Sequence, residues 1–204
     1  MLDKIMRPLK DRFLTPFVSL IAGSFSPNAI TLISFLFALA SAGFLLMRMS
    51  GWALALWALN RIFDGLDGAV ARHQNRQTDF GGYLDIMLDF ITYALLPLVF
   101  TLRYGMGEST WLALAVMLGL FYVNAASWMY LSSLLEKNHA GASIRGEQTS
   151  VAMPSGLVEG TETIIIYTLL FIIPGRMTLL FYVMSAALVP GILFRLVWAK
   201  KNLH

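Results

Sequence analysis

The chain has 204 residues, enough for one domain, and 57% of them are hydrophobic while only 13% are charged. Soluble domains carry about 25% charged residues, so this composition excludes an ordinary soluble protein and predicts a membrane protein with several spans. The net charge of +3 is small, and the absence of cysteine excludes both disulfide bonds and thiolate metal ligands.

The first 17 residues carry apolar side chains three or four positions apart, which is the spacing of one helix face. The apolar positions are Leu2, Ile5, Met6, Leu9 and Phe13. Charged residues lie between them, so the pattern predicts an amphipathic helix over residues 2–17 in the headgroup layer of a membrane. The alternative is a basic tail without regular structure.

Six apolar stretches follow, each close to the ~20 residues that a helix needs to cross the hydrocarbon of a bilayer. They lie near residues 28–47, 51–72, 80–102, 110–135, 155–174 and 177–198. The expected fold is therefore all-α and integral to the membrane. It has six transmembrane helices preceded by the N-terminal interfacial helix, in a single domain over residues 1–204.

Lysine and arginine are distributed unevenly between the two ends of these spans. With the N-terminus in the cytoplasm, eleven of them, including Arg195, flank the spans on the cytoplasmic side, whereas Arg48, Arg103 and Arg176 flank the outer side. Cytoplasmic loops carry the excess of basic residues in membrane proteins. Both termini are therefore expected in the cytoplasm, together with the longest polar connection, residues 136–150.

The second and third spans contain four aspartates, although a charged residue at membrane depth costs about 2.5–3.5 kcal/mol on insertion scales. Asp64 and Asp67 are three residues apart, and Asp85 and Asp89 are four apart, so each pair shares one helix face. Because only a short polar link separates the spans, both pairs lie at similar depth. Two antiparallel helices would bring the four carboxylates together just inside the cytoplasmic face.

Four carboxylates in one place repel one another unless cations neutralise them. Oxygen ligands suit Mg²⁺, Mn²⁺ or Ca²⁺, and two divalent ions would balance the four charges and clamp a phosphate group. Ion pairing with Arg61 and Arg72 is the structural alternative, but two arginines cannot neutralise four aspartates. Gly65, Gly68 and Gly81 would let a diphosphate approach the backbone, although small residues also serve close helix packing.

This run of residues resembles the signature of the CDP-alcohol phosphatidyltransferase family: Asp-x-x-Asp-Gly-x-x-Ala-Arg, eight residues, then Gly-x-x-x-Asp-x-x-x-Asp. The fixed positions are filled here by Asp64, Asp67, Gly68, Ala71, Arg72, Gly81, Asp85 and Asp89. The resemblance implies an enzyme of phospholipid biosynthesis in a bacterial inner membrane, with its active site facing the cytoplasm. It would transfer a phosphatidyl group from a CDP-linked lipid, such as CDP-diacylglycerol, to a small alcohol and release CMP.

The resemblance also implies roles for individual residues. Asp64, Asp67 and Asp85 would hold two divalent cations, Mg²⁺ or Mn²⁺, and Asp89 would lie at the metal site and act as general base on the acceptor alcohol. The implied donor-binding positions are Asn28, Thr31, Gly68, Ala71, Arg72, Thr78 and Gly81. A homodimer is implied as well, and nucleic acid is not an expected partner.

The acceptor is left open by the signature. Glu159 and Glu162 share a helix face at the start of the fifth span, where they would suit a neutral polyol or a cationic headgroup. Acids at a helix N-terminus also simply favour the helix dipole. Arg145, with Arg76 and Lys137 on the same side of the membrane, would instead suit a phosphate-bearing acceptor. Glu159, Glu162 and Arg145 are the candidate acceptor-binding residues.

Three other functions compete with this interpretation. In a variant of the chemistry, CDP carries the headgroup and diacylglycerol is the lipid acceptor. A divalent-cation transporter also places acids inside the membrane, but its acidic pathway would continue to the outer face, where these spans are apolar. A membrane scaffold without activity would not need four acids at this spacing.

Overall fold

The structure is a computed structural model that describes residues 16, 18, 24–105, 107–137 and 158–203. Its regular elements are α2 (Pro27–Leu46), α3 (Ser50–His73), α4 (Asp79–Tyr104), α5 (Glu108–Lys137), α7 (Gly160–Ile172), η1 (Pro174–Arg176) and α8 (Met177–Asn202). No strand occurs within the described ranges, which confirms the all-α class. Each of the six predicted spans contains one α-helix.

Four of these helical segments are long and apolar enough to cross a membrane: α2, α4, α5 and the continuous η1–α8 segment. α3 has 24 residues, but its charged residues lower its hydropathy. α7 has only 13 residues, about 20 Å at 1.5 Å per residue, against the roughly 30 Å of a bilayer core. The predicted interfacial helix over residues 2–17 lies outside the described residues except for Pro16.

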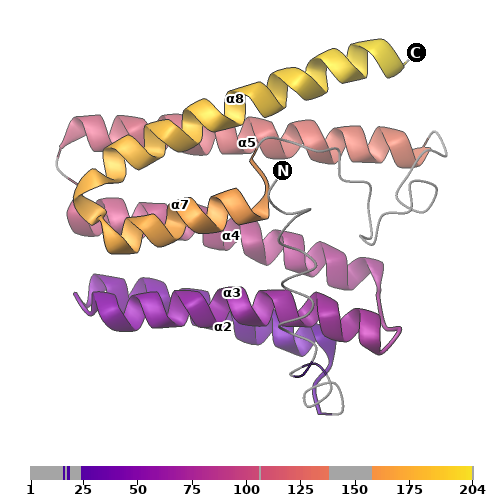
Figure 1. Ribbon diagram of the computed structural model, residues 1–204, viewed down its shortest axis with the longest axis horizontal. Helices are drawn as coiled ribbons and strands as arrows, with labels where there is room; N and C mark the ends of the chain where they lie inside the picture. Colours follow the sequence, from indigo (N-terminus) through magenta and orange to yellow (C-terminus); the bar gives the residue numbers. More distant parts are fainter. Residues whose placement is uncertain (1–15, 17, 19–23, 106, 138–157, 204) are drawn as a thin grey trace.

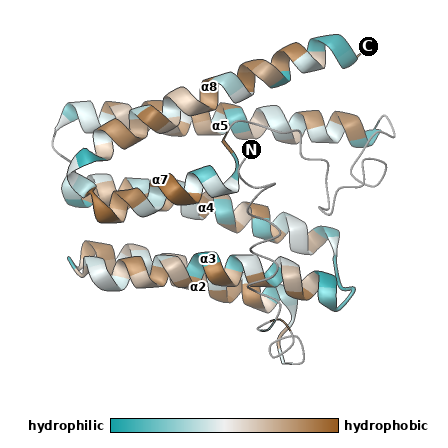
Figure 2. Ribbon diagram, viewed as in Figure 1, coloured by the Kyte–Doolittle hydropathy of each residue, from teal (hydrophilic) through white to brown (hydrophobic). Residues whose placement is uncertain are grey.

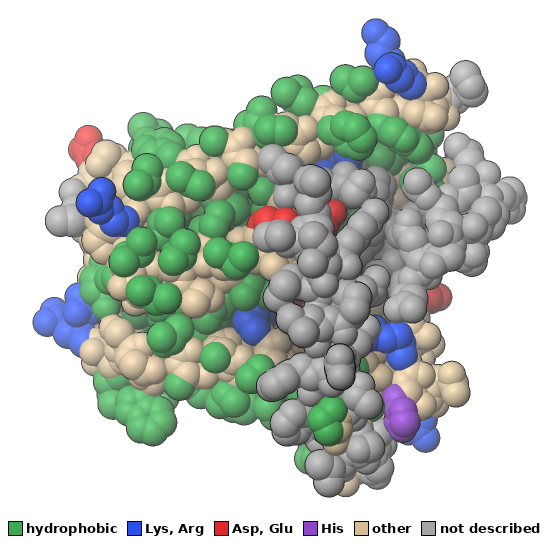
Figure 3. All heavy atoms as spheres, in the orientation of Figure 1, with side chains coloured by type: hydrophobic (Ala, Val, Ile, Leu, Met, Phe, Trp, Pro, Cys, Tyr) green, Lys and Arg blue, Asp and Glu red, His purple; other side chains and the backbone are tan. Residues whose placement is uncertain are grey.

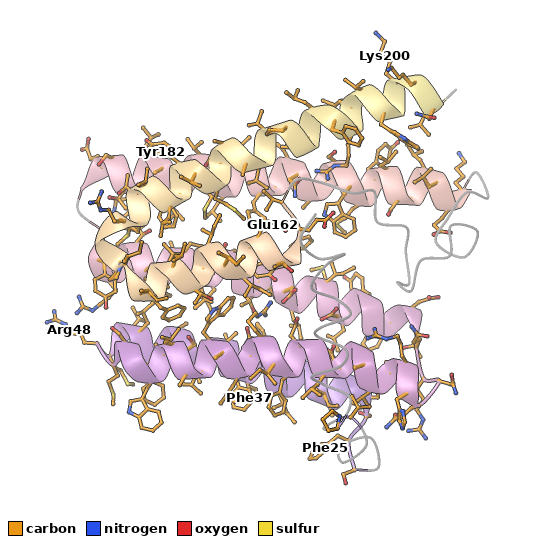
Figure 4. The ribbon with its side chains drawn as sticks, viewed as in Figure 1. Phe25, Phe37, Arg48, Glu162, Tyr182 and Lys200 are labelled. Carbon is orange, nitrogen blue, oxygen red and sulfur yellow. The ribbon has the colours of Figure 1, made fainter. Side chains whose placement is uncertain are left out.

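The helices lie side by side in one bundle (Figure 1). α2 packs against both α3 and α4, α5 packs along α8, and α7 contacts α3 and α4. The link between α3 and α4 lies at the same end of the bundle as the C-terminal ends of α5 and α8 (Figure 1). Arg48, at the turn before α3, and Lys200, in the last turn of α8, lie at opposite ends (Figure 4).

Polarity is distributed along the bundle as expected for a membrane protein. The most hydrophilic segments are the helix ends, including the link after α3 and the end of α8 (Figure 2). Hydrophobic side chains cover much of the middle of the visible face, and most lysines and arginines lie near its ends (Figure 3). Leu36, Leu112 and Phe194 are among many large apolar side chains that are exposed. A surface of this kind fits lipid rather than water.

The main hydrophobic core fills the half of the bundle away from the link between α3 and α4. It combines the end of α2 and the start of α3 with the later turns of α4 and α7 and the first half of α8. Aromatic rings pack there: Phe171 lies edge-on to Phe100, with centroids 4.7 Å apart, and stacks on Trp57. This apolar half adjoins the polar half of the bundle, which contains the aspartates.

Hydrogen bonds fix α2 against α3 at the boundary between the two halves. The Ser34 hydroxyl donates to the Asn60 carbonyl oxygen over 2.8 Å, and the Asn60 amide donates to the Ser34 carbonyl oxygen over 2.9 Å. Nearer the other end, the Ser41 hydroxyl donates to the Ala53 carbonyl oxygen. These reciprocal bonds set the register in which α2 presents its polar residues to α3.

Candidate active site

The aspartates occupy matching positions on two antiparallel helices. Asp67 lies six residues before the end of α3, and Asp85 lies six residues after the start of α4. Asp64 and Asp89 lie nine and ten residues from the same ends. At 1.5 Å per residue these are depths of roughly 9 Å and 14–15 Å, so the predicted common level of the four acids is present.

α3 and α4 make little direct contact with each other, although the sequence suggested neighbouring helices. α2 packs against both of them on one side, and α7 contacts both of them as well. The separation leaves a small recess between α3 and α4, which α2 also lines.

The recess is strongly polar. Its lining consists of Thr31, Ser34 and Phe35 from α2, Asn60 and Asp64 from α3, and Asp85, Leu88, Asp89 and Thr92 from α4. Three of the four predicted metal-site aspartates therefore face one space, and hydroxyl and amide groups surround them. All of the polar groups in this lining can offer oxygen atoms, the ligands that hard divalent cations prefer.

Asp67, the fourth acid, lies beside the recess and is only 5% exposed. The Thr31 hydroxyl donates to Asp67 Oδ2 over 2.6 Å, and the Gly68 backbone N–H donates to Asp67 Oδ1. Since Thr31 belongs to α2, this bond joins α2 to α3 and fixes the carboxylate. Contact between Thr31 and a nucleotide stays a prediction.

Arg61, which the sequence analysis predicted to lie within a span, is a cation next to these acids. Its side chain is 8% exposed, and Nη2 lies 3.0 Å from Asp89 Oδ1 and 3.7 Å from Asp64 Oδ1. The ion pairing that the sequence offered as the alternative to a metal site is therefore present for Arg61. One guanidinium cannot balance four carboxylates, so the cluster still favours additional cations.

A divalent ion fits the chemistry of these donors. Among the described residues, no three acidic or histidine side chains converge closely enough to coordinate one ion as they stand. Asp67 is turned toward Thr31, and Asp89 is turned toward Arg61. The donor set nevertheless consists of oxygen atoms with an excess of negative charge, which suits Mg²⁺ or Mn²⁺.

Several predicted donor-binding residues lie together where α2 and α4 begin. A Cβ atom added to Gly81 would lie 3.0 Å from Asn28 Oδ1 and 3.1 Å from Thr78 Oγ1, so glycine allows this close approach. Thr78 caps α4, because its hydroxyl accepts the Gly81 N–H over 3.0 Å. On α3, a Cβ on Gly68 would lie 3.4 Å from Arg72 Nη1. These residues form two small groups near the same end of the bundle.

The predicted acceptor residues are placed only in part. Glu159 and Glu162 form a capping box at the start of α7, in which the Glu159 N–H donates to Glu162 Oε2 over 3.1 Å. This is the helix-capping role that the sequence already allowed, and an acceptor role stays a prediction. Glu162 lies midway along the bundle in Figure 4. Arg145 lies outside the described residues.

One buried charge was missed in the sequence, where Arg195 was counted as part of a cytoplasmic flank. Arg195 is 3% exposed, and its guanidinium donates to Ser127 Oγ over 3.1 Å and to Asn124 Oδ1. It lies seven residues before the end of α8, at roughly 10 Å depth, close to the level of the aspartates. Asn124 and Ser127 are three residues apart in an apolar span, which was the available signal.

The fold and the recess define a membrane-type helical bundle with an acidic cluster between its helices. The model of the CDP-alcohol phosphatidyltransferase family matches residues 24–198, and the chain belongs to this family. The transferase expected from the signature is therefore confirmed. The protein is an enzyme of phospholipid biosynthesis that moves a phosphatidyl group from a CDP-linked lipid to an alcohol.

Two relatives are similar to this chain in sequence, and one solved structure shares its fold. The chain is 36% identical over 153 residues to inner membrane protein YnjF of Escherichia coli, covering 74% of this chain and 71% of that protein. It is 33% identical to phosphatidylinositol phosphate synthase of Corynebacterium glutamicum, covering 69% and 60%. The structure of Mycobacterium tuberculosis phosphatidylinositol phosphate synthase with CDP-DAG bound aligns with a TM-score of 0.64 and 20% identity, covering 91% and 92% of the two chains.

Proposed function

We propose that the recess between α3 and α4 is the place where the CDP-linked lipid and the acceptor alcohol react. The observation that carries this proposal is the set of three aspartates, Asp64, Asp85 and Asp89, that line the recess, with Asp67 beside it. These four residues would hold two divalent cations, Mg²⁺ or Mn²⁺. Bound ions would neutralise charge on the diphosphate and on the departing CMP.

The protein side chains supply the remaining steps. Asp89 accepts the proton of the acceptor hydroxyl. The hydroxyl oxygen of the acceptor then forms a bond to the lipid-proximal phosphorus while the bond from phosphorus to CMP breaks. The two groups of residues near the helix ends, Asn28 with Thr78 and Gly81, and Gly68 with Arg72, contact the nucleotide and its diphosphate. Thr31 and Ala71 complete the donor side.

We further infer that the acceptor is a phosphate-bearing polyol. Two relatives with similarity to this chain are named phosphatidylinositol phosphate synthase and archaetidylinositol phosphate synthase. Arg195 supports the same acceptor class, because it is a buried cation near the depth of the aspartates. Its hydrogen-bond partners Asn124 and Ser127 are neutral, and Glu159 is the acid whose charge acts on it. A guanidinium matches the geometry of phosphate oxygens.

The acceptor class is tested with purified protein, radiolabelled CDP-diacylglycerol and Mn²⁺ or Mg²⁺. Inositol phosphate, inositol, glycerol phosphate, glycerol and serine are compared by release of CMP. We expect a phosphorylated polyol to give at least tenfold higher kcat/KM than its unphosphorylated form. Equal or faster reaction with inositol or serine would contradict the proposal. The same panel with Arg195→Gln, Arg145→Ala and Glu159→Gln shows which residue affects the KM of the acceptor.

We also propose that the six α-helices of the described residues cross or enter a bacterial inner membrane, with the site and both termini in the cytoplasm. An interfacial helix would lie at the N-terminus, and two copies would form a homodimer. The uneven placement of lysine and arginine supports this orientation. The first relative described above is itself named an inner membrane protein.

The orientation can be measured by labelling single cysteines, because the natural chain contains none. Asn75→Cys lies in the link after α3, and Glu108→Cys lies at the start of α5. In intact cells a maleimide that cannot cross membranes should label position 108 and spare position 75, and disrupting the membrane should expose both. Labelling of position 75 in intact cells would show that the protein has the opposite orientation.

A further inference from the structure

Arg61 is held in the middle of a helix that consists largely of apolar residues. It lies eleven residues after the first residue of α3 and twelve before the last. A charge at such depth is costly and marks functional positions in membrane proteins. A role in balancing the charge of the aspartates would explain why Arg61 is present. Such a role would not require any particular orientation of the guanidinium.

Several groups other than the acids nevertheless hold the guanidinium of Arg61 in place. Nε donates to Asn60 Oδ1 over 2.7 Å, and Asn60 is itself bonded to Ser34 of α2. Nη1 donates to the Tyr93 hydroxyl over 2.8 Å. The guanidinium also lies over the rings of Trp57 and Tyr93, 4.8 and 5.3 Å from their centroids. These cation–π contacts orient its plane.

The residues around Arg61 are fixed in turn by α7. Trp57 Nε1 donates to Thr168 Oγ1 over 3.0 Å. The Tyr167 hydroxyl donates to the Tyr93 carbonyl oxygen over 2.6 Å, and the Tyr167 ring packs edge-on against the Tyr93 ring. Three helices besides α3 therefore contribute, directly or through one residue, to the position of one guanidinium.

We propose that Arg61 is a positioning residue for Asp89. Nη2 donates to Asp89 Oδ1 over 3.0 Å, which restrains rotation of the carboxylate and leaves Oδ2 to receive the proton of the acceptor hydroxyl. This inference rests on the proposed role of Asp89 as general base. The acceptor oxygen then bonds to phosphorus, and CMP leaves with the electrons of the broken bond. Alignment of this kind raises the rate without changing the affinity for the donor.

The test compares Arg61→Gln and Arg61→Lys with the wild-type protein, each purified as the full chain. At saturating Mn²⁺ and donor, we expect Arg61→Gln to lower kcat at least 30-fold while the KM of the donor stays within threefold. Arg61→Lys keeps the charge but not the fork of donors, so it should recover only part of the rate. Mn²⁺ affinity, measured by the EPR signal of the free ion, should be unchanged or tighter in Arg61→Gln.

Two outcomes would overturn the inference. If Arg61→Gln retains kcat within twofold, Arg61 contributes neither charge nor orientation to the reaction. If Arg61→Lys restores the full rate, Arg61 acts through its charge and not through orientation. Failure of the proposed function is distinguishable, because the wild-type protein would then release no CMP with any acceptor.

Tyr93→Phe tests the positioning role of Arg61 if Arg61→Gln does not fold. It keeps the ring below the guanidinium and removes only the hydroxyl bound to Nη1, so kcat should fall three- to tenfold. Tyr104→Phe is its matched control, since Tyr104 lies on the same helix and its hydroxyl is hydrogen-bonded to Ser50 Oγ over 2.7 Å at the other end of the bundle, away from Arg61. It should lower stability without lowering kcat. Equal kcat values in the two variants would reject the positioning role.

Discussion

Asp89→Asn should lower turnover by about 10²–10⁴-fold, the range that general-base catalysis contributes, while binding of the CDP-linked lipid stays largely intact. The asparagine side chain has the same shape, and its amide oxygen can still accept the bond from Arg61 Nη2 that Asp89 Oδ1 accepts now. It cannot take a proton from the acceptor hydroxyl. The measurement combines CMP release at saturating substrates with equilibrium binding of the radiolabelled donor.

Asp79→Asn is the matched control for this variant. It makes the same substitution in the same helix, at an exposed position in the first turn of α4 that does not line the recess. Its turnover should stay within twofold of the wild type. Loss of donor binding in Asp89→Asn would identify Asp89 mainly as a metal ligand, and near-normal turnover would place the general base elsewhere.

The parts of the site that the sequence predicted are those that depend on local geometry. Helical periodicity alone puts Asp64 with Asp67 and Asp85 with Asp89 on common faces, and the short link after α3 sets equal depth. The structure has both features. The helix bounds agree within a few residues, except that α7 begins at Gly160 and not near 155. Hydropathy gives the apolar stretch, whereas a capping box sets the start of the helix.

The parts that the sequence did not predict depend on contacts between distant segments. Thr31 and Asp67 are 36 residues apart, and Arg195 and Asn124 are 71 residues apart. Hydropathy placed Arg195 at the end of a span and in the aqueous flank, but packing of α8 along α5 buries it. Likewise the spacing of the acids could not show that α2 packs against both α3 and α4 and lines the recess with them.

The second large effect expected concerns the metal. The double variant Asp64→Asn, Asp85→Asn should weaken Mn²⁺ binding by more than about 100-fold and abolish CMP release. Both side chains line the recess, and their replacement leaves Asp89 as the remaining acid in its lining. Loss of outer-shell groups alone costs 10–100-fold in metal affinity, so loss of two direct ligands should cost more. EPR of free Mn²⁺ measures binding independently of activity.

A control for overall charge is needed, because removing any two carboxylates makes a protein less attractive to cations. Asp79→Asn, Glu108→Gln removes two negative charges at exposed positions outside the recess. Exposed charges are screened beyond about 8–10 Å at physiological salt, so this variant should bind Mn²⁺ within twofold of the wild type. If the control loses as much affinity as the recess variant, or if the recess variant keeps its affinity, the metal does not bind between α3 and α4. The aspartates would then need another role to explain their cost within the membrane.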